Sequence, residues 1–220
     1  MTGTRYRLVI GNKAWSSWSL RPWLAMTRAG LAFEEINIRL RRPDSTTQLL
    51  AHSPSGLVPT LYDGELAIWD SLAILEYLAE QHPEAHLWPG AKEARATARS
   101  ICAEMHSGFA ALRQHCPMDL LASLPQESFL PEVESNIRRI VALWQDCRTR
   151  FGAAGLFLFG AFSAADAMYA PVASRFRTYV PDLASYGDDG TALAYVDTIF
   201  AMPEMAAWAE GARAELANVE

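Results

Sequence analysis

Several of the motifs that most readily disclose an enzyme's cofactor are absent from this sequence. It has no glycine-rich G-x-G-x-x-G turn, no Walker-type phosphate loop and no H-E-x-x-H motif, so it carries no fingerprint of a dinucleotide, a nucleoside triphosphate or a zinc-protease site. The three cysteines, Cys102, Cys116 and Cys147, are far apart and form no C-x-x-C pair, and the five histidines are scattered. We therefore expect neither a disulfide framework nor a bound metal.

Long runs of a single charge and apolar runs of membrane-spanning length are also missing. The net charge of -6 over 220 residues argues against nucleic acid or an anionic membrane surface as the main partner. The first residues pass from two arginines into a short apolar run, without the apolar region and cleavage site of a signal peptide. We expect a cytoplasmic protein that binds neither nucleic acid nor membranes.

Residues 55–78 carry the strongest local signals. Val58 precedes Pro59, so the chain is extended there, and Pro59 has no N–H to give to a sheet. An Asp-Gly pair between two apolar runs predicts a hairpin, and Asp70-Ser71 is typical of a helix start. A helix start beside an interrupted strand presents free amides and a positive dipole end, which suit a carboxylate or another anion.

The residues before this stretch alternate between strand and helix patterns. Residues 6–10 form a short β-type run, a helix is predicted from about residue 18 to residue 29, and residues 35–40 alternate as a half-buried strand does. This order implies a right-handed parallel crossover. Ser45 and Gln48 match a capping box for a short helix. The order βαβαββα predicts a thioredoxin-like α/β domain over residues 1–80.

The rest of the chain is predicted to be helical. Residues 81–90 contain two prolines and a glycine and predict a linker. Residues 93–116 and 132–151 carry apolar stripes at helical spacing, which favour core packing. Ser163 and Asp166 match a second capping box, and two further helices are predicted near residues 191–200 and 203–214. We expect an all-α C-terminal bundle over residues 91–220.

Four segments in this order resemble a soluble glutathione S-transferase: WSSWSLRPW, LVPTL, WDSLAILEYL and FSAAD. The resemblance covers nearly the whole chain and is closest to the serine-type, zeta-like branch that includes maleylacetoacetate isomerases. It implies glutathione as a co-substrate, no metal, a small electrophilic substrate and a homodimer.

The resemblance also implies where glutathione binds. In such proteins the Val58-Pro59 bond is usually cis, and the backbone of Val58 pairs with the cysteinyl part of glutathione. Ser71 and its amide take the γ-glutamyl carboxylate, and Asp70 takes the ammonium group. Opposite charges would then meet at both ends of a small zwitterion.

The chain departs from the zeta pattern at two positions of this site. Trp18, also expected to contact glutathione, replaces a cysteine, which puts cysteine-assisted chemistry in doubt. Leu57 stands where relatives often carry a polar side chain, so one glutathione contact is lost or His52 replaces it. Arg21 is expected to be a structural ion-pair or capping residue.

Ser16 or Ser17 is expected to lie near the glutathione sulfur and to donate a hydrogen bond to the thiolate. A free thiol has a pKa near 8.5, and lowering it by about two units requires roughly 2.7 kcal/mol. A hydrogen bond to a charged group supplies about 1.5–3 kcal/mol. Plain helix capping is the other interpretation of these serines, and the choice between the two serines stays open.

The electrophile pocket is less well defined by the sequence. Trp15, Met105 and Phe109 are candidates for its wall, although Met105 and Phe109 fit core packing equally well. Arg175 or Arg177 would suit an acidic substrate, but their position differs from that of the zeta-branch arginine, and we expect both to be solvated.

The resemblance predicts a glutathione transferase that activates the glutathione thiolate for attack on a hydrophobic or acidic electrophile. Two alternatives remain open. One is a glutathione-dependent cis-trans isomerase of a maleyl-type acid, and the other is a non-catalytic regulatory member of the fold that binds a protein partner.

Overall fold

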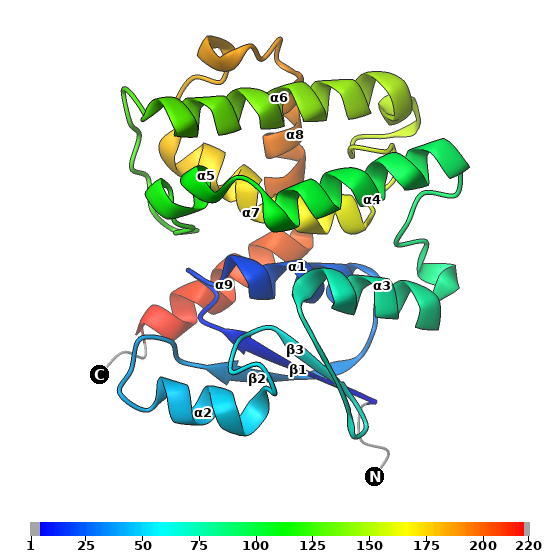
Figure 1. Cartoon of the computed structure of the whole chain (residues 1–220), viewed down its shortest axis with the longest axis vertical. Helices are drawn as coiled ribbons and strands as arrows, with labels where there is room; N and C mark the ends of the chain where they lie inside the picture. The colour runs from blue at the N-terminus through cyan, green and yellow to red at the C-terminus, as the bar shows by residue number, and fades with distance from the viewer. Residues whose placement is uncertain (1–4, 218–220) are drawn as a thin grey trace.

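A four-stranded mixed sheet organises the first third of the chain (Figure 1). The computed structural model describes residues 5–217, so the outermost residues of the two predicted domains lie outside the described range. The strands lie in the order β2-β1-β3-β4. β1 (Tyr6–Gly11) pairs in parallel with β2 (Phe33–Ile38), and β3 (Thr60–Asp63) runs antiparallel to β1 and to β4 (Leu66–Trp69).

Three helices cover the two faces of this sheet. Figure 1 shows α1 (Ser17–Arg28) and α3 (Ser71–Gln81) on the face toward the helical bundle and α2 (Ser45–His52) on the other face. The chain passes from β1 through α1, β2, α2, β3 and β4 to α3. The predicted order βαβαββα is confirmed, and the parallel β1–β2 pair is the predicted crossover.

Two local predictions in this half were wrong. The second strand is shifted toward the N-terminus and ends at Ile38, because the amide of Leu40 donates to the side chain of Asn12 at 2.7 Å instead of extending the ladder. The N-cap of α2 is Asp44, not Ser45. The Ser45 hydroxyl is already engaged in the preceding turn, where it donates to the carbonyl oxygen of Arg39 and accepts from the amide of Arg42.

The second half is a helical bundle built around one buried helix. Its helices are α4 (Lys92–Ser107), α5 (Ala110–His115), α6 (Pro131–Phe151), α7 (Ala164–Tyr179), α8 (Thr191–Phe200) and α9 (Pro203–Ala217), with short 3-10 turns at Pro83–Ala85, Gly152–Ala154 and Ala184–Tyr186. Every residue of α7 except Arg177 is buried. The capping box of Ser163 and Asp166 at the start of α7 is confirmed. Within residues 5–217, no helix combines the length and apolar character needed to cross a bilayer.

The single helix predicted over residues 93–116 is two helices, α4 and α5. The chain turns at Gly108, which is extended, and at Phe109, which has a φ of +55°. A side chain at position 108 would lie 2.7 Å from the carbonyl oxygen of Glu104. The apolar period runs through this break because Met105 and Phe109 both pack in the core.

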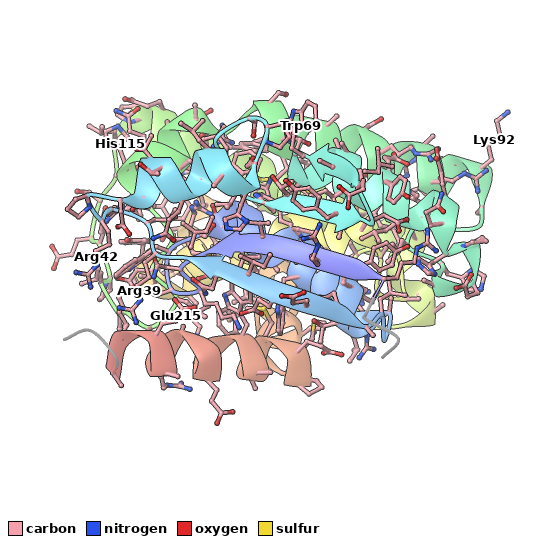
Figure 2. The ribbon with its side chains drawn as sticks, turned by 90° about the horizontal axis from the view of Figure 1, so that it is seen from below. Arg39, Arg42, Trp69, Lys92, His115 and Glu215 are labelled. Carbon is pink, nitrogen blue, oxygen red and sulfur yellow. The ribbon has the colours of Figure 1, made fainter. Side chains whose placement is uncertain are left out.

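The two halves meet through extensive packing rather than through the linker alone. α1 packs against both α7 and α9, so two helices of the second half contact the first. Figure 2 shows Glu215 of α9 facing the β2 edge, where its carboxylate accepts hydrogen bonds from the side chain of Asn37 and the amide of Lys13. Trp69, the last residue of β4, lies at the opposite edge of the sheet (Figure 2). This junction brings side chains of the helical half to the start of α1.

Candidate functional site

A groove of about 590 Å³ lies where the loop before β3, the end of β4, the starts of α1 and α3 and the end of α4 approach one another. The side chains that line it come from residues far apart in the sequence: Trp18, Ser55, Leu57, Val58, Pro59, Trp69, Asp70, Ser71 and His106. Six of the nine are predicted glutathione contacts, and the other three are Ser55, Trp69 and His106. The predicted anion-binding turn and the helix start therefore share one cavity.

The backbone of Val58 is available at this groove. The Val58-Pro59 bond is cis, and β3 begins only at Thr60. Pro59 has no amide hydrogen and so cannot donate to a ladder. Within the described chain, neither the amide nor the carbonyl of Val58 has a hydrogen-bond partner. One donor and one acceptor thus remain for a peptide-like ligand.

Asp70 and Ser71 hold the start of α3 in an unusual conformation. Asp70 has a φ of +77°, and its Oδ1 accepts from the amides of Leu72 at 2.9 Å and Ala73 at 3.2 Å. Asp and Asn tolerate this region better than most residues. Ser71 is fully buried, and its Oγ accepts from Nη1 of Arg21 at 3.2 Å. A carboxylate at this helix start would meet the Ser71 hydroxyl and a positive dipole end.

The two candidate catalytic serines begin α1 and differ in their hydrogen bonds. Ser16 is the N-cap, yet its side chain makes no capping bond and donates to Oγ of Ser19 at 2.7 Å. Oγ of Ser17 accepts from Nη2 of Arg175 at 3.3 Å. In the described chain the Ser17 hydroxyl donates to no acceptor. The proton of Ser16 is engaged, whereas that of Ser17 is available.

Trp18 and His106 form the aromatic side of the groove. Their rings meet edge to face with centroids 5.4 Å apart. The guanidinium of Arg21 lies 4.0 Å from the Trp18 ring centroid, a cation–π arrangement that helps to fix the indole. Because Trp18 replaces the cysteine of the zeta pattern, this position presents a flat apolar surface where that pattern has a thiol.

Comparison with known proteins identifies the family to which this geometry belongs. Residues 15–81 match the N-terminal domain of glutathione S-transferases, and residues 93–214 match their C-terminal domain. The chain belongs to the glutathione S-transferase family.

Relatives within the glutathione S-transferases agree with the predicted zeta-like branch. The chain is 41% identical over 75 residues to a zeta-class glutathione S-transferase of Euphorbia esula, covering 34% of this chain and 33% of that protein. It is 35% identical over 107 residues to a probable maleylacetoacetate isomerase of Caenorhabditis elegans, covering 48% and 50%. These matches span between a third and a half of the relatives' lengths.

Solved glutathione transferases have the same fold. A glutathione transferase homolog from Burkholderia, crystallised with bound glutathione, superposes with a TM-score of 0.70 over 94% of this chain and 98% of that one, at 21% identity. An antarctic clam enzyme, from Laternula elliptica, superposes with a TM-score of 0.69 at 19% identity. At these identities the likeness shows the fold, which is the predicted one.

Six residues predicted for the site do not line the groove of this glutathione S-transferase. The candidate catalytic serines, Ser16 and Ser17, are two of them, and both are buried at the start of α1, next to the groove residue Trp18. His52 ends α2, where its carbonyl accepts from the hydroxyl of Tyr62. Trp15 packs beside the guanidinium of Arg41. The remaining two, Met105 and Phe109, are buried in the core. The apolar wall of the groove is formed by other side chains, Trp18 and Trp69 among them.

The structure also corrects the expectations for two arginines. Arg175 is 3% exposed, not solvated, whereas Arg177 is exposed as expected and packs over Phe200. Arg21 has no exposed surface, and in the described chain it forms no ion pair and contacts Ser71 instead. Sequence reasoning also missed His106, because a lone histidine near the end of a helix gives no local signal of the cavity it faces.

Residues 5–217 contain no group of three or more His, Cys, Asp or Glu side chains arranged to hold a metal ion. The groups that line the groove are hydroxyls, amides, one carboxylate and one imidazole, with guanidinium groups nearby.

Proposed function

We propose that this chain binds glutathione in the groove and activates its thiol for attack on an electrophile. The observation that carries the proposal is the presence, in one cavity, of the unpaired Val58 backbone and the start of α3. Val58 is proposed to pair with the cysteinyl backbone, Ser71 with the γ-glutamyl carboxylate and Asp70 with the ammonium group. The relatives' names and the solved homolog with bound glutathione support this assignment.

Ser17 is the proposed catalytic serine. Its hydroxyl proton is available, while that of Ser16 is donated to Ser19. A donor to the sulfur and the positive end of α1 both favour the thiolate over the thiol. The serine acts as a hydrogen-bond donor, and the thiolate is the nucleophile.

The electrophile is proposed to be a small molecule with an apolar face. Trp18, Pro59 and Trp69 line the groove, with Trp69 50% exposed. Burying these flat apolar side chains against an apolar ligand is favourable because it removes apolar surface from water.

We propose that a second copy of the chain packs in a homodimer on the exposed apolar surface formed by Trp69, Leu57 and Leu66.

Isomerisation of a maleyl-type acid is the second candidate function. One match is named a probable maleylacetoacetate isomerase. Arg113 is half-buried at the edge of the Trp18 ring, with its guanidinium 5.8 Å from the ring centroid, and offers a cation to an acidic substrate. In this reaction the thiol adds to the substrate and leaves again.

Calorimetric titration with glutathione, paired with the ultraviolet absorbance of the bound thiolate from about pH 5 to 9, tests the proposal. Burial raises the pKa of Cys116 to about 11 and that of Cys147 to about 12, and holds that of Cys102 well above its usual value. The protein's own thiols therefore stay protonated over this range, and the absorbance reports on glutathione.

Binding with a thiolate signal well below the free thiol's pKa would support the transferase. Binding without that signal would favour the isomerase or a glutathione carrier. Absence of binding would overturn the proposal in favour of the non-catalytic regulator.

We also propose a cytoplasmic location, which the three unpaired, buried cysteines support.

A further inference from the structure

Three arginines from three helices converge behind the groove. Arg21 of α1 has no exposed surface, Arg175 of α7 is 3% exposed, and Arg113 of α5 is half-buried. Burial lowers the pKa of Arg21 to about 9, and the charges of Arg175 and Arg113 lower it as well. Burial likewise lowers the pKa of Arg175 to about 10, with a contribution from Arg113. Both values lie above 7, so the cluster is positively charged at neutral pH.

No direct ion pair within the described residues balances this charge, although Asp70 acts on Arg21 at longer range. None of the three guanidinium groups forms an ion pair, and Nε and Nη2 of Arg21 are buried without any hydrogen-bond partner. Buried charges in proteins are normally paired, because an unpaired one loses its hydration without compensation. A fold that keeps such a cluster beside a cavity is suited to stabilise an anion there.

The cluster contacts two serine hydroxyls, that of Ser71, which lines the groove, and that of Ser17, which precedes the groove residue Trp18 at the start of α1. Nη2 of Arg175 donates to Oγ of Ser17, and Nη1 of Arg21 donates to Oγ of Ser71. Both serine oxygens therefore accept from a guanidinium group. The Ser71 hydroxyl also donates to Sδ of Met168 at 4.0 Å, whereas the Ser17 hydroxyl donates to no acceptor in the described chain, so its proton is left for a ligand. Arg175 itself is too deeply buried to touch a ligand in the groove. Any effect of Arg175 on the ligand must therefore act through Ser17 or through the electrostatic field of its positive charge.

We propose that Arg175 is a positioning residue for thiolate formation: it orients the Ser17 hydroxyl toward the glutathione sulfur and strengthens it as a donor. This proposal rests on the proposed function above. It assigns to Arg175 a role in activating glutathione, distinct from contact with an acidic electrophile.

The groups that face Arg175 come from several elements. They are Arg21 on α1, Arg113 on α5, Cys116 after α5 and Tyr179 on α7. Burial raises the pKa of Cys116 to about 11 and also raises that of Tyr179. These two groups stay neutral between pH 5 and 9. In the groove, Asp70 and His106 are the other ionisable neighbours.

The test is the pKa of the bound glutathione thiol, read from thiolate absorbance in the full chain. Arg175→Gln is expected to raise it by about one unit, the scale of losing one charge-assisted hydrogen bond. Ser17→Ala is expected to raise it at least as much. If Arg175 acts through Ser17, the double variant will match Ser17→Ala alone. Arg177→Gln, two residues away on the exposed side of α7, should leave the thiol pKa unchanged.

If Arg175→Gln raises the thiol pKa by the same amount in the Ser17→Ala background as in the wild type, Arg175 does not act through Ser17. If Arg175→Gln leaves the thiol pKa of the otherwise wild-type protein unchanged, Arg175 has no role in thiolate formation. Arg175 also donates to the carbonyls of Cys116 and Pro171. Thermal unfolding is therefore recorded for each variant. If Arg175→Gln does not fold, Arg175→Lys replaces it, because lysine keeps a cation at the site. Arg175→Lys is expected to raise the thiol pKa by less than Ser17→Ala does. An unchanged thiol pKa in Arg175→Lys would count against the proposal.

The proposed function and the role of Arg175 can fail separately. If wild-type protein binds no glutathione, or binds it without a lowered thiol pKa, the proposed function is wrong. If the wild type lowers the thiol pKa and the Arg175 variants lower it equally, only the positioning role is wrong.

Discussion

Oδ2 of Asp70 lies 3.3 Å from Nε2 of His106, so the start of α3 is joined to the last turn of α4. Asp70 thereby has two tasks, since its Oδ1 already caps α3. Nδ1 of His106 is buried and has no partner among the described residues. The carboxylate proposed to hold the ammonium group of glutathione thus already has an imidazole as a competing neighbour.

This competition predicts that the side chain at position 106 affects glutathione affinity. The His106 imidazole and the ligand's ammonium group would share the Asp70 carboxylate, so the contact with one weakens the contact with the other. We expect His106→Leu, which cannot hydrogen-bond to Asp70, to bind S-methylglutathione about fourfold more tightly than the wild type, the equivalent of about 0.8 kcal/mol. Calorimetry of both proteins at one pH measures this difference.

His115→Leu, on the exposed end of α5, is the matched control and should follow the wild type. Unchanged affinity in His106→Leu would show that the imidazole does not compete for Asp70.

The two tasks of Asp70 can be separated by two substitutions. Asparagine keeps an oxygen that caps the helix and tolerates positive φ, so Asp70→Asn should unfold within about 0.5 kcal/mol of the wild type. It removes the negative charge, so we expect glutathione affinity to fall about tenfold, in line with a hydrogen bond to a charged group. Asp70→Ala should lose the affinity and also about 1 kcal/mol or more of stability through the lost cap.

Calorimetry and urea unfolding of both variants measure these effects. Wild-type affinity in Asp70→Asn would mean that another group receives the ammonium.

The serines of the two helix starts should differ in kinetic signature. Ser71→Ala is expected to weaken glutathione binding more than it slows the chemical step, and Ser17→Ala should do the reverse. For Ser17→Ala we expect kcat to fall roughly 10- to 100-fold, the equivalent of about 1.4 to 2.7 kcal/mol. Ser16→Ala should stay within about threefold of the wild type, because its proton is donated to Ser19.

Steady-state kinetics with a standard aromatic electrophile, run on all three variants, provide the comparison. A large loss of kcat in Ser16→Ala with none in Ser17→Ala would show that Ser16, and not Ser17, is the catalytic serine.

Much of the fold was predictable because its signals are local. Turn residues, caps and hydrophobic periods lie within a few positions of the elements that they specify, as the Asp70 cap and the box of Ser163 and Asp166 illustrate. The break between α4 and α5 was not predicted because the apolar spacing gives no local signal for it. The apolar spacing of Met105 and Phe109 stays regular on either side of Gly108, so the period carries no trace of the turn.

The surroundings of the site were less predictable because they are made by distant contacts. Arg175 and Ser17 are 158 positions apart, and His106 meets Asp70 only after α4 has packed beside α3. A buried arginine has the same sequence signature as a solvated one. The proposed glutathione contacts could be suggested from the sequence because the short motifs that carry them resemble those of a known family.

Asp166 links the stability of the helical half to pH. It is fully buried, and it accepts hydrogen bonds from the amides of Leu158 and Ser163, the hydroxyl of Ser163 and the hydroxyl of Tyr195. Burial raises its pKa to about 6, against the opposing effect of these donors. In an unfolded chain an aspartate has a pKa of about 3.9.

Between about pH 4 and 6 the folded state therefore holds a proton that the unfolded state has released. Stability must then fall as the pH rises through this window and level off above it, by at most about 3 kcal/mol for a shift of two units. Asp166→Asn cannot titrate, so its unfolding free energy should be flatter from pH 4 to 6. At pH 7 it should be about 2 kcal/mol less stable than the wild type, because one acceptor oxygen is replaced by a donor.

Urea unfolding at several values between pH 4 and 7.5, followed by tryptophan fluorescence, gives both curves. Asp197→Asn, an exposed substitution on α8, controls for the loss of a carboxylate elsewhere and should run parallel to the wild type. If the curve of Asp166→Asn also runs parallel to the wild type, Asp166 does not take up a proton in this window. The capping box would then act only through its hydrogen bonds, and the loss of stability at pH 7 would remain.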